Sequence, residues 1–207
     1  ALTKAIVFID EVMSDGANGR SRKSLVGMAI SQIRKTLRIG ARNFSFKNTF
    51  AFQAVTLDTS IIEFNDAEKK FPFEKLFTII TDGIAVEKKN KDQITIPFSE
   101  SPKILISTNF TIEGVDRSTV DRQFVVEFSD FYSEEHRPIH DFKKRFFETD
   151  WDADDWSAFD NFMIGNIQHY LINGLVECSY VNLIEKKLND MTCKEFVEFM
   201  DDYKSGE

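Results

Sequence analysis

The chain of 207 residues is long enough for one α/β domain, or for a core domain with a small helical appendage. Its composition of 42% hydrophobic and 29% charged residues is that of a globular protein, and no apolar run approaches the ~20 residues that span a bilayer. The formal net charge of −8 argues against a uniformly basic nucleic-acid coat, but not against a local cluster of Lys and Arg. The chain starts at Ala1 without Met, and we expect it to belong to a longer polypeptide.

The amino-terminal part of the sequence predicts a strand, a loop and a helix. Residues 4–10, KAIVFID, form an apolar and partly β-branched run that is typical of a buried strand. A loop rich in Gly, Asn, Ser and Arg follows at 14–22, and residues 23–37 place apolar side chains at helical spacing. Residues 40–57 mix aromatic and basic side chains without a clear period.

The middle of the sequence predicts three more buried strands, at residues 59–66, 103–109 and 122–128. A helix is expected at 72–83, with Pro in its first turn and Gly after its end. Two short alternating runs at 84–98 flank a charged Asn-Lys-Asp centre, which is the pattern of a β-hairpin. Strands separated by helices predict an α/β sheet with one inserted hairpin.

After about residue 130 the composition changes to that of amphipathic helices. One helix is expected from about 156 to 174, and a further pair at 183–188 and 193–203. The sequence thus predicts a core over residues 1–130 and a C-terminal helical region over 131–207.

The stretch at residues 15–27, DGANGRSRKSLVG, is the strongest chemical signal. It approaches the phosphate-binding pattern G-x-x-x-x-G-K-[ST], but Ala17 and Arg22 stand where Gly is expected. Gly16 and Gly19 still allow tight backbone turns, and a Lys-Ser pair opens a helix whose N-terminus offers N–H donors to an anion. Taken alone, the stretch fits a phosphate-binding loop and a basic surface turn equally well.

Polar residues at the later strand ends favour the phosphate-binding interpretation. The second strand ends in Asn65-Asp66, which leaves one carboxylate to hold the water shell of Mg²⁺. The third ends on Asn109, a polar group able to sense a γ-phosphate, and Arg122 at the fourth could reach a phosphate across a subunit boundary, with Arg117 as second choice. Each feature alone has an ordinary structural explanation, but their joint order is much harder to attribute to chance.

This order of motifs, with a hairpin between the acidic strand and the Asn-ending strand, resembles the superfamily-three helicase domain. More narrowly, the phrases NGRSRKSL, ITIPF, SPKILISTN, DRQFVVEFSDFY and HRP are similar to the ATPase domain of phage, prophage and plasmid primase-helicase replication proteins. The resemblance covers roughly residues 4–175. It implies a P-loop NTPase core of the AAA+ type, with three layers, the hairpin at about 84–98 as an insert, and a C-terminal helical region.

The resemblance also implies an activity and partners. The chain would be an ATP-dependent DNA helicase or translocase that uses ATP and Mg²⁺, binds single-stranded DNA and assembles into a homo-oligomeric ring, hexameric in that family. A primase domain would lie upstream in the full-length chain. The expected location is the cytoplasm of a bacterial or phage-infected cell, with no membrane partner.

Residue by residue, the resemblance implies a nucleotide-binding loop formed by Gly16, Asn18, Gly19, Arg20, Ser21, Arg22, Lys23, Ser24 and Leu25. Lys23 would contact the β- and γ-phosphates, and Ser24 and Asp66 would serve the magnesium ion. The catalytic residues would be Asp66, Asn109 as polar sensor, and Arg122 as an arginine finger acting on a neighbour's ATP.

The hairpin tip carries Lys88, Lys89 and Lys91, which we expect to bind DNA. Three lysines within four positions on a turn suit contact with backbone phosphates and are poorly suited to reading bases. In an acidic chain such a cluster is informative, although a solvated hairpin tip would also accept these residues.

Two departures from the family pattern leave the catalytic activity open. Arg22 replaces a Gly, and a non-Gly residue forced into a left-handed conformation costs roughly 1–2 kcal/mol. Asn65 replaces an acidic residue, which should weaken water activation more than nucleotide binding. The alternatives are a slow ATPase, a weakened P-loop module that binds nucleotide or DNA and oligomerises without turnover, and a nucleotide-binding regulator with no nucleic-acid role.

Overall fold

The computed structural model describes residues 2–11, 23–112, 117–133, 135–176, 183, 187–188 and 192–205. Its strands are β1 (Ala5–Asp10), β2 (Thr36–Gly40), β3 (Ile61–Ala67), β4 (Gly83–Lys88), β5 (Lys91–Pro97), β6 (Lys103–Thr108) and β7 (Gln123–Phe128). Its helices are α1 (Lys23–Ile33), η1 (Ala41–Asn43), η2 (Phe73–Leu76), α2 (Phe77–Thr81), α3 (Arg117–Asp121), α4 (Pro138–Phe142), α5 (Ala153–Asn173) and α7 (Lys194–Ser205).

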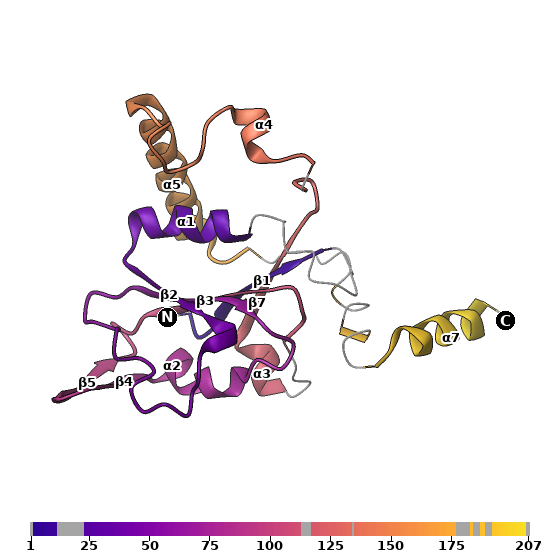
Figure 1. Ribbon diagram of the computed structural model, residues 1–207, viewed down its shortest axis with the longest axis horizontal. Coiled ribbons are helices and arrows are strands. Elements are labelled where there is room, and N and C mark those ends of the chain that lie inside the picture. Colours follow the sequence, from indigo (N-terminus) through magenta and orange to yellow (C-terminus); the bar gives the residue numbers. More distant parts are fainter. Residues whose placement is uncertain are drawn as a thin grey trace.

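The described strands form a five-stranded sheet in the order β2-β3-β6-β1-β7, in which every neighbouring pair is parallel. Strands β4 and β5 pair with each other as an antiparallel hairpin. Helix α1 covers one face of the sheet, and α2 and α3 lie with the hairpin on the other face (Figure 1). The predicted α/β class, with three layers and an inserted hairpin, is confirmed, and this architecture is consistent with a P-loop NTPase-like fold. Among the helices that the structure describes, none has the length and apolar character needed to cross a bilayer.

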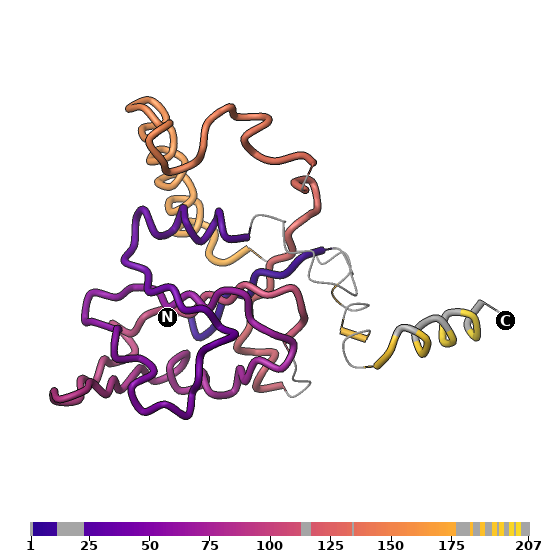
Figure 2. The backbone as a smooth tube through the Cα atoms, in the orientation of Figure 1, coloured from indigo at the N-terminus to yellow at the C-terminus, as the bar shows by residue number. Residues whose placement is uncertain are grey.

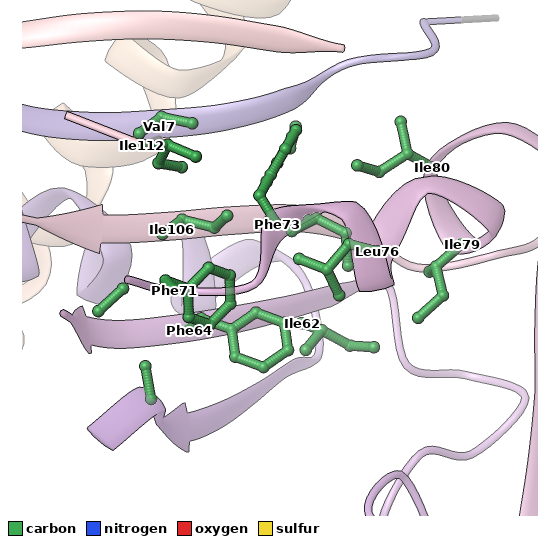
Figure 3. Packing of buried hydrophobic residues seen from close by; sticks show 14 of the residues in the cluster. Val7, Ile62, Phe64, Phe71, Phe73, Leu76, Ile79, Ile80, Ile106 and Ile112 are labelled. Carbon is green, nitrogen blue, oxygen red and sulfur yellow. The ribbon is translucent and has the colours of Figure 1, made fainter. Parts of the chain in front are cut away.

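The hydrophobic core lies between the sheet and the layer that contains η2 and α2. Phe64 of β3 and Ile106 of β6 are fully buried, and they point toward Phe73 and Leu76 of η2 (Figure 3). Burial of a side chain of this size contributes roughly 1.5–3 kcal/mol, so this cluster contributes much of the stability of the core.

The aromatic segment that showed no period packs against the buried Phe64 of β3. The ring centroids of Phe44, Phe46 and Phe52 lie 5.2, 5.9 and 6.4 Å from that of Phe64. These phenylalanines therefore pack against the core next to β2 and shield it from solvent. A segment of this kind follows the shape of its neighbours, so it has neither the period of a helix nor that of a strand.

The predicted helix at 23–37 is wrong at its carboxyl end. Helix α1 ends at Ile33, and the chain then forms β2, which pairs with β3 in a register that matches Leu37 with Ile62. Leu37 stands at helical spacing from the apolar residues of α1, but it is apolar because its side chain packs against the core. Pairing with a strand 25 residues away decided the conformation, and local periodicity does not report such pairing.

The other predicted elements are confirmed with small shifts in their boundaries. Helix α5 begins at Ala153, three residues earlier than expected, because the Asp152 carboxylate accepts hydrogen bonds from the N–H groups of Asp154 and Asp155. Helix α7 is present at the carboxyl terminus, whereas residues 184–186 of the helix expected at 183–188 lie outside the described residues. The chain path in Figure 2 shows that the segment carrying α4 and α5 runs on the same side of the sheet as α1.

Candidate functional site

Lys23 lies at the centre of the site, where α1 begins. Its Nζ lies 2.5 Å from Oδ2 of Asp10, the last residue of β1, and donates a hydrogen bond of 2.8 Å to Oδ1 of Asn109, which follows β6. The side chains of Lys23 and Asp10 are only 9% and 12% exposed. The structure therefore brings two of the predicted residues, Lys23 and Asn109, together at the carboxyl edge of the parallel sheet, where ligands bind in folds of this type.

The pKa of Lys23 is subject to two opposing effects. Burial lowers the pKa of Lys23, and the hydrogen bond to Asp10, together with the negative charges of Asp10 and Asp66, acts in the opposite direction. A phosphate placed beside this ammonium group would raise the pKa of Lys23, as Asp10 does, because a nearby opposite charge stabilises the protonated form.

Asp66 does not touch Lys23. The residue adopts a left-handed conformation with φ 60°, which Asp tolerates better than most residues, and its Oδ2 lies 2.8 Å from Nε of Arg42 in η1. Half of its side chain is exposed, and its charge reaches Lys23 only through space. The Asp66 carboxylate is therefore close to the site, but it forms an ion pair with Arg42.

Asn65, the other residue at the end of β3, accepts a hydrogen bond that links this strand to β6. Ser107 Oγ donates a hydrogen bond of 2.8 Å to Oδ1 of Asn65, and the same Oγ accepts a bond of 3.3 Å from the N–H of Asp66. These bonds connect β3 to β6 at the position of a β-bulge. Asn65 thus helps to shape the strand end that carries Asp66.

Oxygen donors of the kind that Mg²⁺ prefers surround this edge of the sheet. They are the hydroxyl of Ser24 in the first turn of α1, the carboxylates of Asp10 and Asp66, and the amide oxygen of Asn109. Among the described residues, no group of three or more His, Cys, Asp or Glu side chains could hold a metal ion alone. This donor set fits a magnesium ion that takes most of its ligands from nucleotide phosphates and water, and it does not fit an ion held by the protein alone.

An ion pair with a buried carboxylate, which the sequence reasoning missed, supports the first turn of α1. Glu63 of β3 is 2% exposed, and its Oε2 lies 2.6 Å from Nε of Arg38 in β2. Arg38 also donates from Nη2 to the backbone carbonyl of Ser24, at 3.3 Å. A Cβ atom on Gly27 would lie 2.4 Å from Oε1 of Glu63, so a larger residue there would have to displace the Glu63 carboxylate that bonds Arg38. The pair positions the helix start that carries Lys23.

Arg122 lies at the opposite end of the sheet from Lys23. It precedes β7, and its carbonyl accepts a hydrogen bond of 2.8 Å from the N–H of Ala5, the first residue of β1. Its guanidinium group is 4.7 Å from the centre of the Phe77 ring and donates from Nη1 to Oγ of Ser118 at 2.6 Å. Arg122 therefore does not contribute to the Lys23 site of its own chain. The second choice, Arg117, is 93% exposed on α3.

The hairpin presents its three predicted DNA-binding lysines away from the Lys23 site. Lys88 pairs with Lys91 across the hairpin, and Lys89 and Asn90 form the turn, with Asn90 at φ 57°. The base of the hairpin is buried in the core through Ile84 and Ile96, so the tip is a projection from a fixed base (Figure 1).

Six predicted loop residues lie outside the described residues: Gly16, Asn18, Gly19, Arg20, Ser21 and Arg22. The remaining three, Lys23, Ser24 and Leu25, form the start of α1. The sequence reasoning did not single out Asp10. Its position at the end of the strand KAIVFID was the available signal, because Asp66 and Asn109 were found from their positions at strand ends.

No protein-family model and no curated protein matches this sequence. Among solved structures, the chain is similar to the A form apo structure of the NrS-1 C-terminal region, with a TM-score of 0.48 and 19% identity, covering 90% of this chain and 41% of that one. A second A form apo structure of that region, residues 305–718, gives a TM-score of 0.46 with the same identity and coverage. JCV helicase bound to a substituted acetamide gives a TM-score of 0.42 and 16% identity over 62% of this chain and 36% of that one. The chain thus spans about two fifths of the NrS-1 structures. Each TM-score is below 0.5, and the function proposed below rests on the geometry of the site itself.

Proposed function

We propose that this chain is an ATP-dependent DNA helicase or translocase module of a mobile-element primase-helicase. The observation that carries the proposal is the buried Lys23 at the start of α1, held between Asp10 and Asn109 at the carboxyl edge of a parallel sheet. A buried ammonium group at a helix start, next to a glycine-containing loop, is the arrangement that binds the terminal phosphates of a nucleotide.

The residues at this edge have distinct roles in the proposal. Lys23 binds the β- and γ-phosphates, and Asn109, which already accepts a hydrogen bond from Lys23, responds to the γ-phosphate. Ser24 and Asp66 hold a magnesium ion that, when bound, neutralises charge on the phosphates. For Asp66 this role requires its carboxylate to leave Arg42 or to be shared with it.

Arg122 acts on the nucleotide of a neighbouring subunit in this proposal. Its place at the amino end of β7, across the length of the sheet from Lys23, supports action between subunits and not within one chain. The proposed assembly is a homo-oligomeric ring in which the Arg122 edge of one subunit faces the Lys23 edge of the next.

The hairpin binds single-stranded DNA in the proposal. Lys89 and Lys91 are exposed, and Lys88 is partly exposed, on a turn whose base is fixed in the core. Cationic side chains on a projecting turn suit contact with a flexible phosphate backbone. In a longer polypeptide this module would follow a primase domain.

The proposal is tested by ATP binding, followed by calorimetry, and by phosphate release with and without single-stranded DNA. The unmodified chain is expected to bind ATP, with DNA increasing its turnover, and Lys23→Ala is expected to abolish binding. Lys35→Ala is the matched control, since Lys35 is also an ion-paired lysine but lies in an exposed pair with Asp58. Absence of ATP binding by the unmodified chain would reject the proposal.

A second candidate function is a module that binds nucleotide or DNA and oligomerises without turnover. The observation that favours it is Asn65, whose amide is bonded to Ser107 where the family pattern has a carboxylate. Asn65→Asp separates the two functions. An increase in turnover at unchanged ATP affinity would indicate a site weakened by loss of its second carboxylate.

A further inference from the structure

Helix α5 leaves most of its apolar surface exposed. It is 21 residues long, and none of them is buried in the structure. Its first half has partners within the chain, because the ring of Trp156 packs 4.9 Å from that of Trp151. Its second half carries Ile164, Ile167 and Leu171, which are between 48% and 75% exposed. A run of large apolar side chains on one exposed helix is typical of a protein interface.

The three residues Ile164, Ile167 and Leu171 form what we call the α5 strip. They repeat at positions i, i+3 and i+7, so they lie on one side of the helix. Residues 161–174 contain no Asp, Glu, Lys or Arg, although the whole chain has a net charge of −8. A second acidic copy of the chain can therefore approach this half of α5 without strong like-charge repulsion and without burying a charge.

Helix α7 carries a second exposed apolar face, formed by Phe196, Phe199 and Tyr203, which we call the α7 strip. These side chains are between 44% and 67% exposed, and they also repeat at i, i+3 and i+7. The rings of Phe199 and Tyr203 stack with their centroids 6.5 Å apart, which makes the strip a continuous aromatic surface. In Figure 1, α7 extends away from the sheet and lies far from α5, so the two strips do not meet within one chain.

The two strips match each other in length and spacing. Each extends over two helical turns, about 10 Å along the helix axis. Spacing of this kind allows the side chains of one helix to pack between those of another, as in coiled coils. The 20 residues between Asn173 and Lys194 reach at most about 70 Å when extended, which is enough to carry α7 to a neighbouring subunit.

We propose that the α7 strip of one subunit packs on the α5 strip of the next subunit in a homo-oligomer. Because every copy supplies one strip of each kind, exchange around a closed assembly covers all of them. The inference rests on the homo-oligomer in the proposed function and names the faces that hold it together. The contact itself needs neither nucleotide nor DNA.

Cross-linking tests which faces meet. Cys178 and Cys193 are first replaced by Ser, and single cysteines are then introduced as Ile167→Cys in one chain and Phe199→Cys in a second, tagged chain. Both positions lie in the middle of their strips, so they come close whether the helices run parallel or antiparallel. On oxidation without nucleotide, the mixed disulfide between the two chains is expected to form several-fold more than self-linked chains. Leu57→Cys, at an exposed position outside both strips, is the control partner.

Light scattering over a series of protein concentrations measures the strength of the contact. Leu171→Lys and Phe199→Lys each place a charge in one strip, and each should raise the subunit dissociation constant by about tenfold or more. Both side chains are exposed within one chain, so the fold should be preserved, as far-ultraviolet circular dichroism can check. Leu57→Lys makes the same change at a residue that is 65% exposed outside both strips and should leave the dissociation constant unchanged.

Three cross-linking results would overturn the inference. A chain carrying both cysteines that links only within itself would place α7 on its own α5. Self-linking of the Ile167→Cys chain as strongly as the mixed disulfide would place α5 against α5. Linking no stronger than with Leu57→Cys would show that the strips do not meet.

ATP binding judges the proposed function separately. A mixed disulfide in a chain that does not bind ATP would leave this contact standing and reject the nucleotide-dependent function. ATP binding without the mixed disulfide would reject only the contact between the strips.

Discussion

The ammonium group of Lys23 lies 2.5 Å from the carboxylate of Asp10, so the helix start is joined to the end of the strand that precedes it. The intervening loop is the proposed phosphate-binding loop, and this ion pair fixes the positions of its two ends relative to each other. Both side chains are almost fully buried, which makes the pair sensitive to the loss of either partner.

Asp10→Ala should lower the free energy of unfolding by about 3–5 kcal/mol, because it leaves the Lys23 ammonium without its buried counter-charge. Urea unfolding followed by tryptophan fluorescence measures the change. Asp58→Ala removes the partner of Lys35 in an exposed pair and should have a much smaller effect. Equal losses in the two variants would show that burial of the Lys23 pair has no energetic consequence.

Gly27→Ala should destabilise the protein by about 1–3 kcal/mol, since the added Cβ would lie 2.4 Å from the buried carboxylate of Glu63. Gly165 is the matched control, because it also lies in a helix but has no atom within 4 Å of its added Cβ. Gly165→Ala should stabilise the protein by roughly 0.5–1 kcal/mol through helix propensity. Thermal unfolding of both variants measures this contrast. A neutral Gly27→Ala would mean that Glu63 moves away without cost.

Replacement of Lys88, Lys89 and Lys91 together by alanine should weaken binding to single-stranded DNA and flatten its salt dependence. Each lost phosphate contact reduces the slope of log K against log salt by about 0.7. Fluorescence anisotropy with a labelled oligonucleotide at several salt concentrations measures the slope. The control replaces Lys47, Lys70 and Lys75, which are exposed lysines outside the hairpin, and changes the net charge equally. Identical slopes for the two triple variants would remove the hairpin from the DNA site.

Mixing two inactive variants tests whether Arg122 acts between subunits. Arg122→Ala and Lys23→Ala should each lack ATP turnover, but in a mixed assembly an intact Lys23 edge can face an intact Arg122 edge. Phosphate release by the mixture should therefore exceed the sum of the separate variants. A mixture that remains inactive, although light scattering shows that it assembles, would contradict the proposed role of Arg122.

Asp152 gives a pH-dependent signature at the start of α5. Its pKa is lowered to about 2, first by the hydrogen bond from the N–H of Asp155 and then by Lys144. Because the folded pKa lies below the ordinary value for Asp, its stabilising effect is present above about pH 4 and is lost as the pH falls toward 2. Carboxyl carbon shifts measured by NMR should show this titration, and Lys144→Met should raise the pKa only in part, since the N–H bonds remain. Titration of Asp152 near pH 4 in the unmodified chain would contradict this arrangement.

Strands whose side chains are buried on both faces could be predicted from the sequence alone. The apolar runs at β1, β3 and β6 are continuous, as expected for parallel strands covered by helices, and each was placed within about two residues. The edge strand β7 is only partly buried, but its own apolar run was also sufficient to place it. The edge strand β2 could not be placed, because TLRIG is half exposed and its conformation depends on pairing with Ile61–Asn65.

The candidate site was predictable in part for the same reason. Asp66 and Asn109 end strands that the apolar pattern defined, so their convergence at one edge follows from a parallel sheet. What the sequence does not reveal is how each side chain is partnered. Asp66 turns toward Arg42, and Asp10 takes the place beside Lys23, because the bulge in β3 and the position of η1 decide these contacts.

The central position of β6 has a consequence for how the molecule is made. In the sheet order, β6 separates β1 from β3, yet it is formed by residues 103–108, after both of its neighbours have been synthesised. Until that segment is available, β1 and the β2-β3 pair each present an open edge, and Lys23 lacks Asn109. A nascent chain that ends before Asn109 is therefore expected to be both unable to bind nucleotide and prone to pairing with other chains, so that site formation and protection of the sheet edges occur in the same step.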